Sequence, residues 1–304
     1  MTIALSLAFW FALQAPQPAP RWEDPHLLAA DDALRRKDLR TAAAILQTVI
    51  DAEPQCRPAA YLQLAQVRLD LGDERQAIVT FERGVKAHPE SPELSKRFGG
   101  LLFRKNAIEP RAGELLAAAV KLNAGDAEAH FLYGQWACLN NLQEVCIAEL
   151  TRAAALPASG NQAKMQIYTL VAMAEDKLNR TDRAEAAFRK ARQANLALTP
   201  PEPNSLLEYV KFLAKESRDA EAQQEIEELL KFAPQFGPAY LERAKFFSQQ
   251  GRQEKAAEQA ELALRYAGAD KGEQRAAHVF LAKTYYALGR EEQAKPHQAW
   301  VQSH

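Results

Sequence analysis

The sequence has few of the residues that favour β-sheets and no excess of positive charge. Val, Ile and Thr together supply only about a tenth of the chain and helix formers dominate, which argues against a sheet protein. The 38 basic and 39 acidic residues leave a formal net charge of −1, so the basic excess of a dedicated nucleic-acid binder is absent. We therefore expect an all-α protein with no nucleic-acid partner.

Motifs that carry enzyme chemistry are also absent. The sequence contains no Gly-x-x-x-x-Gly-Lys phosphate loop, no Gly-x-Ser-x-Gly nucleophile elbow and no His-Glu-x-x-His zinc helix. Adjacent glutamates such as Glu227 and Glu228 would point to different faces of a helix, so they do not form an acid–base pair. We expect no enzyme activity, no cofactor and no bound metal.

Alanine is the residue in clear excess, at about a fifth of the chain. The 47% of apolar residues and 25% of charged residues are ordinary for a globular protein and argue against wholesale disorder. An alanine-rich helical protein can bring its helix backbones close together, so the composition predicts closely packed helices.

Residues 3–15 form an uncharged apolar run at the start of the chain. The run is shorter than the roughly 20 residues that a membrane-spanning helix needs, and no later stretch is apolar enough to span a bilayer. Its length matches the core of a secretory signal peptide, and three prolines follow it. We assign residues 1–20 to a signal peptide and Pro-rich linker and expect a secreted or periplasmic protein. A retained membrane anchor and a cytosolic start are the alternatives.

A repeat runs through the rest of the chain. Gly72, Gly251 and Gly289 each separate two apolar helix patterns, and an alanine follows each glycine after five residues. Extending this spacing, at intervals of about 34 to 38 residues, reaches eight positions with a small side chain: Ala42, Ala77, Ala112, Cys146, Ala184, Ala222, Ala256 and Ala294. Prolines such as Pro89 close several units, where a helix must stop.

This order of residues resembles the tetratricopeptide repeat, a helix-turn-helix unit. The second unit matches the family pattern best, through Tyr61, Leu64, Ala65, Gly72, Ala77, Phe81, Gly84 and Pro89. The resemblance covers about residues 23–304 and implies a right-handed α-solenoid of about eight helical hairpins. It also places His130 and His278 where the repeat carries a large packing ring in its first helix.

Two longer connections interrupt the regular spacing, at Pro157–Lys164 and Leu196–Asn204. They indicate places where the array bends or a subdomain ends. We assign units one to four to residues 23–160 and units five to eight to residues 161–304.

Cys138 and Cys146 lie eight residues apart, on either side of the expected turn of unit four. Because position 146 is the inward small site, the two side chains can meet, and a disulfide would stabilise the fold by about 2–3 kcal/mol in an oxidising compartment. The alternative is that Cys146 is a small core residue and Cys138 a chance neighbour. With His130 they would make only three metal ligands, one short of a structural site.

The resemblance implies that the first helix of each unit lines a concave face that binds a peptide. In units three to five the positions carried over are apolar and suit an amphipathic or extended segment of a partner: Phe103, Phe131, Leu132, Leu139, Leu170 and Met173. The alternative is that several of them pack against neighbouring units.

In units six to eight one equivalent position reads Lys211, Lys245 and Lys283. Such a lysine ladder would receive acidic side chains or a terminal carboxylate of a partner. The alternative is that Glu208 and Glu242, three residues earlier, pair with Lys211 and Lys245 within the helix. The family's carboxylate-clamp arrangement of Lys and Asn is not reproduced.

The sequence therefore predicts a non-enzymatic scaffold that binds a peptide or a partner subunit in the concave groove of a helical array. A membrane-tethered assembly factor, anchored by residues 3–15, is one alternative. An accessory or regulatory subunit of an enzyme complex encoded elsewhere is the other.

Overall fold

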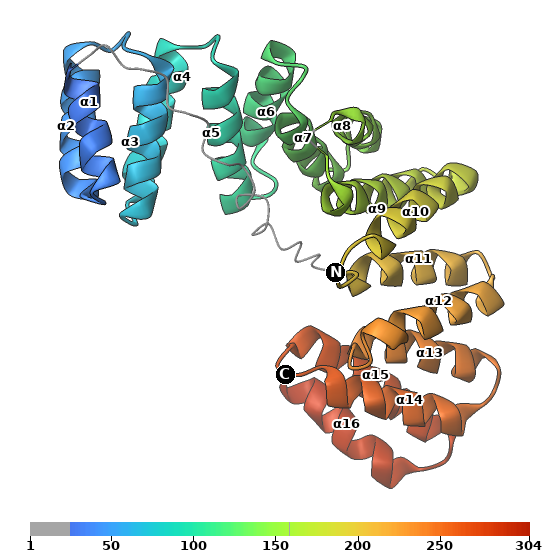
Figure 1. Cartoon of the computed structure of the whole chain (residues 1–304). Helices are drawn as coiled ribbons and strands as arrows, with labels where there is room; N and C mark the ends of the chain where they lie inside the picture. The colour runs from blue at the N-terminus through green and yellow to red at the C-terminus, as the bar shows by residue number, and fades with distance from the viewer. Residues whose placement is uncertain (1–24, 158) are drawn as a thin grey trace. The chain divides into compact units, whose positions relative to one another are not determined.

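The computed structural model describes residues 25–157 and 159–304, and this part of the chain is built from sixteen α-helices and no strand (Figure 1). The all-α prediction is confirmed. The apolar run at residues 3–15 and its signal-peptide assignment lie outside the described residues. None of the described helices is both long and apolar enough to cross a bilayer.

The chain divides into two compact units, one ending at Leu156 and the other beginning at Pro157. The first unit contains α1 (Pro25–Arg35), α2 (Leu39–Ala52), α3 (Pro58–Asp70), α4 (Glu74–Ala87), α5 (Pro92–Lys105), α6 (Pro110–Leu122), α7 (Ala127–Leu139) and α8 (Gln143–Ala155). The second contains α9 (Asn161–Lys177), α10 (Thr181–Leu196), α11 (Pro203–Lys215), α12 (Asp219–Phe232), α13 (Gly237–Gln249), α14 (Gln253–Tyr266), α15 (Lys271–Ala287) and α16 (Glu291–Ser303).

Consecutive helices pair into hairpins, from α1 with α2 to α15 with α16. Neighbouring hairpins of a unit then pack on each other, as α3 packs on α5 and α5 on α7. The predicted architecture of about eight stacked helical hairpins is therefore confirmed. Stability in such an array is the sum of hairpin and nearest-neighbour terms.

The turn inside a hairpin needs a residue that tolerates positive φ. Gly72 has φ +80° between α3 and α4, and Asn141 has φ +59° between α7 and α8. Asp73 then begins α4, because its carboxylate accepts a hydrogen bond from the backbone N–H of Gln76 at 3.1 Å. These local signals explain why the repeat can be recognised in the sequence.

Small residues let the two helices of a hairpin approach closely. A Cβ added to Gly134 of α7 would lie 2.6 Å from Cγ of Leu150 in α8. One added to Gly99 of α5 would lie 2.9 Å from Cγ of Leu116 in α6. Neither contact is tolerable, so glycine at these two positions is required by packing.

Aromatic rings join successive hairpins within each unit. In the first unit Phe81 of α4 stacks on Phe98 of α5 with ring centroids 5.6 Å apart. In the second unit Phe188 of α10 contacts Tyr209 and Phe212 of α11, with centroids 5.5 and 5.1 Å apart. These buried rings pack successive hairpins against each other.

The connection at Leu196–Asn204 lies inside the second unit, where one side chain holds it. Nδ2 of Asn195 donates to the carbonyl of Glu202 at 2.7 Å, and the Glu202 N–H donates to Oδ1 of Asn195 at 2.7 Å. Asn195 is completely buried, so this pair of hydrogen bonds fixes the path of the longer connection.

Candidate functional site

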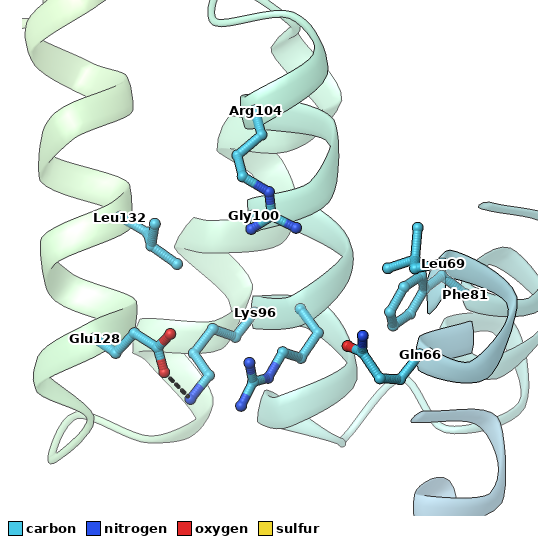
Figure 2. A pocket seen from close by; sticks show the side chains of 9 residues that line it. Gln66, Leu69, Phe81, Lys96, Gly100, Arg104, Glu128 and Leu132 are labelled. Atoms are coloured by element: carbon cyan, nitrogen blue, oxygen red, sulfur yellow. Dashed lines mark ion pairs between the residues drawn. The ribbon is translucent and has the colours of Figure 1, made fainter. Parts of the chain in front are cut away.

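A small pocket in the first unit lies between the first helices of three successive hairpins, α3, α5 and α7 (Figure 2). Phe81 of α4 also contributes to its wall. The pocket combines apolar surface with a high density of charge, and its lining consists of Gln66, Leu69, Phe81, Lys96, Arg97, Gly100, Arg104, Glu128 and Leu132.

The α5 part of the pocket floor is Gly100, which has no side chain. A Cβ added at Gly100 would meet Cδ1 of Leu132 at 3.4 Å and an Arg104 nitrogen at 3.8 Å, both ordinary contact distances. Packing therefore does not require glycine here, in contrast to the preceding Gly99. The repeat places Gln66 and Gln135 at the equivalent positions of the hairpins on either side, so α5 lacks a side chain where its neighbours carry a long one.

Lys96 joins α5 to α7 beside this position. Its ammonium group lies 2.9 Å from a Glu93 oxygen, 2.8 Å from Asp126 and 3.0 Å from Glu128. The lysine side chain is only 7% exposed. Burial acts to lower the pKa of Lys96, but the three carboxylates outweigh it and raise that pKa above the ordinary value. Lys96 thus links two hairpins through buried ion pairs.

Two arginines flank Gly100 along α5. Nε of Arg97 donates to Oε1 of Glu93 at 2.7 Å. Arg104 extends along α5 toward Gly100 (Figure 2). Burial lowers the pKa of the Arg104 guanidinium and the positive charge of Arg97 lowers it further, while Glu128 acts in the opposite direction. The two guanidinium groups therefore repel each other in a partly desolvated site.

The apolar residues expected in the groove differ widely in exposure. Phe103, Phe131 and Leu170 are buried, at 2%, 5% and 7% exposure, which matches the alternative of packing between helices. Leu132 is half-buried and lines the pocket. Leu139 is exposed at the end of α7, and Met173 is half-buried on α9 in the second unit.

The lysines of the second unit carry partners from their own helices. Nζ of Lys211 lies 2.8 Å from Glu208, and Nζ of Lys245 lies 2.7 Å from Glu242. Lys283 of α15 is exposed. The pairing within the helix is the alternative that the spacing allowed, and binding of an acidic partner by the three lysines stays a prediction.

Cys138 of α7 and Cys146 of α8 form a disulfide in the structure, with their Cα atoms 4.9 Å apart. It closes the turn of the fourth hairpin at the far end of α7 from Glu128. His130 is engaged elsewhere, because its Nδ1 lies 2.6 Å from Glu149 and its Nε2 lies 3.1 Å from the Ala124 carbonyl. Throughout the described ranges no cluster of three or more His, Cys, Asp or Glu side chains is arranged to hold a metal ion.

Sequence reasoning missed the pocket and one aromatic cluster. The consecutive glycines at 99 and 100 inside an apolar helix pattern were the available signal for the pocket, because a helix interior disfavours glycine. In the last hairpin Nδ1 of His278 and Nδ1 of His297 lie 2.7 Å apart, and His278 stacks on Trp300 with centroids 4.3 Å apart. No short-range spacing in the sequence predicts this aromatic cluster.

The solved structures that the chain resembles share the fold. The C-terminal part of a TPR repeat-containing protein from Cytophaga hutchinsonii superposes with a TM-score of 0.59 at 15% identity, covering 82% of this chain and 98% of that one. A tetratricopeptide repeat protein from Parabacteroides merdae gives 0.55 at 15% identity, covering 84% and 97%. PilF of Pseudomonas aeruginosa gives 0.54 at 18% identity, covering 71% and 94%.

Family models agree with these structural likenesses. A model described as tetratricopeptide repeat matches residues 33–96, and a second model of the same description matches residues 166–195. A comparison with curated protein sequences finds no match. The phased small residues, the paired helices and both family models lead to one assignment: the chain contains tetratricopeptide repeats.

Proposed function

We propose that this protein is a non-enzymatic interaction scaffold that binds a peptide or a partner subunit along the first helices of its hairpins. The observation that carries the proposal is the pocket between α3, α5 and α7, which offers charged and apolar side chains side by side. Sites that bind other molecules commonly combine apolar lining with a few placed polar groups.

A secreted or periplasmic location is part of the proposal. The Cys138–Cys146 pairing supports it, since disulfides persist in oxidising compartments and are rare in the cytosol. A membrane-tethered assembly factor, with residues 3–15 as its anchor, and an accessory subunit of an enzyme complex are the alternatives. Sequencing the N-terminus of the protein purified from its host separates the exported form from the anchored one.

Site-specific photo-crosslinking in the native host tests the interaction function. A photoreactive residue at Gln66, exposed on α3 at the pocket, is compared with one at Val79, which is 41% exposed on α4 of the same hairpin. We expect defined crosslinked species from position 66 and none from position 79. Equal crosslinking from both positions, or crosslinking from position 79 alone, would contradict binding at the pocket.

A further inference from the structure

Helix α16 is attached to the rest of the second unit by few buried groups. Ala294 is the only one of its residues that is buried, whereas four residues of α14 are buried. Pro296 lies inside α16 and has no backbone N–H to donate to the preceding turn. The helix packs on α15, with which it forms the last hairpin. Its attachment therefore depends on the few side chains that it places against α15.

Aromatic rings of the two helices meet in this contact. Nδ1 of His297 on α16 lies 2.7 Å from Nδ1 of His278 on α15. The His297 ring stacks on Tyr285 of α15 with centroids 5.9 Å apart, and Trp300 of α16 stacks on His278 with centroids 4.3 Å apart. Both histidines are half-buried. Two histidines, each stacked on a ring of the other helix, thus join α15 to α16.

The short distance between the two Nδ1 atoms limits how many protons the pair can hold. A hydrogen bond between two ring nitrogens needs one N–H donor and one free lone pair. The neutral pair meets this condition, and so does a pair with one added proton, because the neutral ring still accepts. When both rings are protonated, both Nδ1 atoms carry hydrogens, and two donors cannot stay 2.7 Å apart. The contact is therefore compatible with one added proton and not with two.

The attached position of α16 resists protonation of the pair. Burial lowers the pKa of His278 below its ordinary value of 6.5, and the nearby His297 and His304 lower it further. Burial also lowers the pKa of His297. Because the rings bind protons more readily when α16 is detached, its attachment is strongest above pH 6.5 and weakens as the pH falls through the lowered pKa values.

Neighbouring charges on α14 and α15 act in both directions. Glu261 of α14 acts to raise the pKa of His297, and its carboxylate also accepts a hydrogen bond from the hydroxyl group of Tyr285. The guanidinium of Arg275 on α15 donates to the Val301 carbonyl of α16 at 3.1 Å, so it places a positive charge at the same helix contact. One carboxylate favours the first added proton, and a second proton would be added beside positive charge.

Helix α16 contributes to an apolar cluster that its release would open. Leu281 and Tyr285 of α15 are 0% and 5% exposed and pack in one buried cluster with Ala257 and Ala260 of α14 and Ala294 of α16. In an array of hairpins each repeat contacts only its neighbours, so one end can separate while the preceding hairpins stay folded. Separation of α16 would expose the α15 side of this cluster to solvent.

We propose that the His278–His297 pair is a pH switch, in which a second added proton releases α16 from α15 and uncovers the apolar surface around Leu281 and Tyr285. At neutral pH the hydrogen bond between the two rings and their stacking hold α16 in place. The inference concerns regulation of the array and does not depend on partner binding in the first unit.

Hydrogen–deuterium exchange of the full chain, measured by mass spectrometry, tests the switch. Peptides from residues 291–303 report on α16, and peptides from residues 253–266 report on α14 as an internal reference. Between pH 7 and about pH 5 we expect the protection of α16, corrected for the intrinsic exchange rate, to fall by about tenfold or more, while α14 keeps its protection.

His297→Gln is the variant that removes the switch and keeps a contact. A glutamine amide has both donors and an acceptor, so it can pair with Nδ1 of His278 whether or not that ring is protonated. We expect α16 in this variant to be protected to the same extent at both pH values. His304→Gln is the matched control, because it replaces a histidine that stacks on Trp300 outside the pair, and it should keep the release.

The outcomes distinguish a local switch from other causes. Unchanged protection of α16 in the wild type between the two pH values overturns the proposal. Equal loss of protection in α14 and α16 overturns local release, because the whole unit then opens. His278→Gln is the second variant, with the same expected result, and protection of α16 at pH 7 confirms that the helix is attached in each. A pH-dependent loss that survives in both variants overturns the assignment to this pair.

Discussion

The two compact units use the same repeat but bury the lysines of their first helices to different extents. In the first unit Lys96 of α5 reaches Asp126 and Glu128 at the start of α7, so its ion pairs cross between hairpins. In the second unit Lys211 and Lys245 pair with glutamates one turn earlier on their own helices, and Lys215 of α11, which crosses to Asp176 of α9, is 52% exposed. The buried pairs of Lys96 hold two hairpins together, whereas exposed pairs contribute little.

The difference has a consequence for binding. Lys96, Asp126 and Glu128 have side chains no more than 17% exposed, so their ion pairs hold α5 against α7 beside the pocket. The side chains of Lys211 and Lys245 are 41% and 48% exposed. The family fold is common to both units, and the distribution of charge makes the first the better candidate for a specific site.

The largest expected effect comes from Lys96→Met. The substitution leaves Asp126 and Glu128 without their buried cation, and removing one partner of a buried ion pair costs about 3–5 kcal/mol. Urea unfolding followed by circular dichroism measures the loss. Lys211→Met is the matched control from the second unit and should change stability by no more than about 1 kcal/mol, since exposed pairs contribute little. Similar losses for both variants would contradict the comparison.

Removal of the Cys138–Cys146 disulfide should have the next largest effect. Closing a loop of this length stabilises by about 2–3 kcal/mol in the chain-entropy model. The double variant Cys138→Ala, Cys146→Ala should therefore unfold at lower urea concentration than the oxidised protein and should match the reduced wild type. Mass spectrometry of unreduced protein that finds both thiols alkylated would show that the bond does not form.

Replacing one glycine of α5 and one of α7 by alanine should give smaller changes in stability, and the two changes should have opposite signs. Gly134→Ala places a methyl group 2.6 Å from Leu150 and should destabilise by about 1–3 kcal/mol. Gly100→Ala makes only ordinary contacts and should stabilise by about 0.5–1 kcal/mol. Thermal melting of the two variants checks the signs, and destabilisation by both would show that Gly100 is required for packing.

The smallest expected effect is a dependence on pH in the last hairpin. Burial, followed by the nearby His297 and His304, lowers the pKa of His278 below its ordinary value of 6.5. Burial likewise lowers the pKa of His297, against an opposing contribution of Glu261 on α14. The unfolded chain then binds protons more readily than the folded one, so stability is complete above pH 6.5 and declines as the pH falls through the lowered pKa values.

A variant isolates that contribution. His278→Gln together with His297→Gln should melt at a temperature that depends less on pH between 7 and about 5 than that of the wild type. The comparison uses thermal melting across this range at constant ionic strength. An equal acid-induced loss in wild type and variant would assign the pH dependence to other groups.

Much of the fold follows from signals that lie close together in the sequence. The turn at Gly72 and the inward Ala77 five residues later are fixed by one hairpin's own backbone and packing, and the same spacing recurs along the chain. Burial of rings such as Phe81 and Phe98 follows from that phase. This part of the fold can be predicted from the sequence because every hairpin packs in the same way, so the same residue spacing recurs.

The pocket could not be predicted from the sequence in this way, because its lining residues come from different hairpins. The sequence around Lys96 shows Glu93 and Arg97, but Asp126 and Glu128 lie about thirty residues away and meet it only when α5 packs on α7. Phe103 and Phe131 occupy expected groove positions but are buried, since neighbouring helices cover them. The exposure of a side chain depends on packing between repeats. The spacing of residues within one repeat does not predict which positions a neighbouring repeat covers.

One measurement tests the account most directly: photo-crosslinking in the native host from position 66, at the pocket, beside position 79 on α4. If the pocket between α3, α5 and α7 binds a partner, position 66 gives defined crosslinked species and position 79 gives none. Equal crosslinking from the two positions, or crosslinking from position 79 alone, would contradict the assignment of this pocket as the binding site.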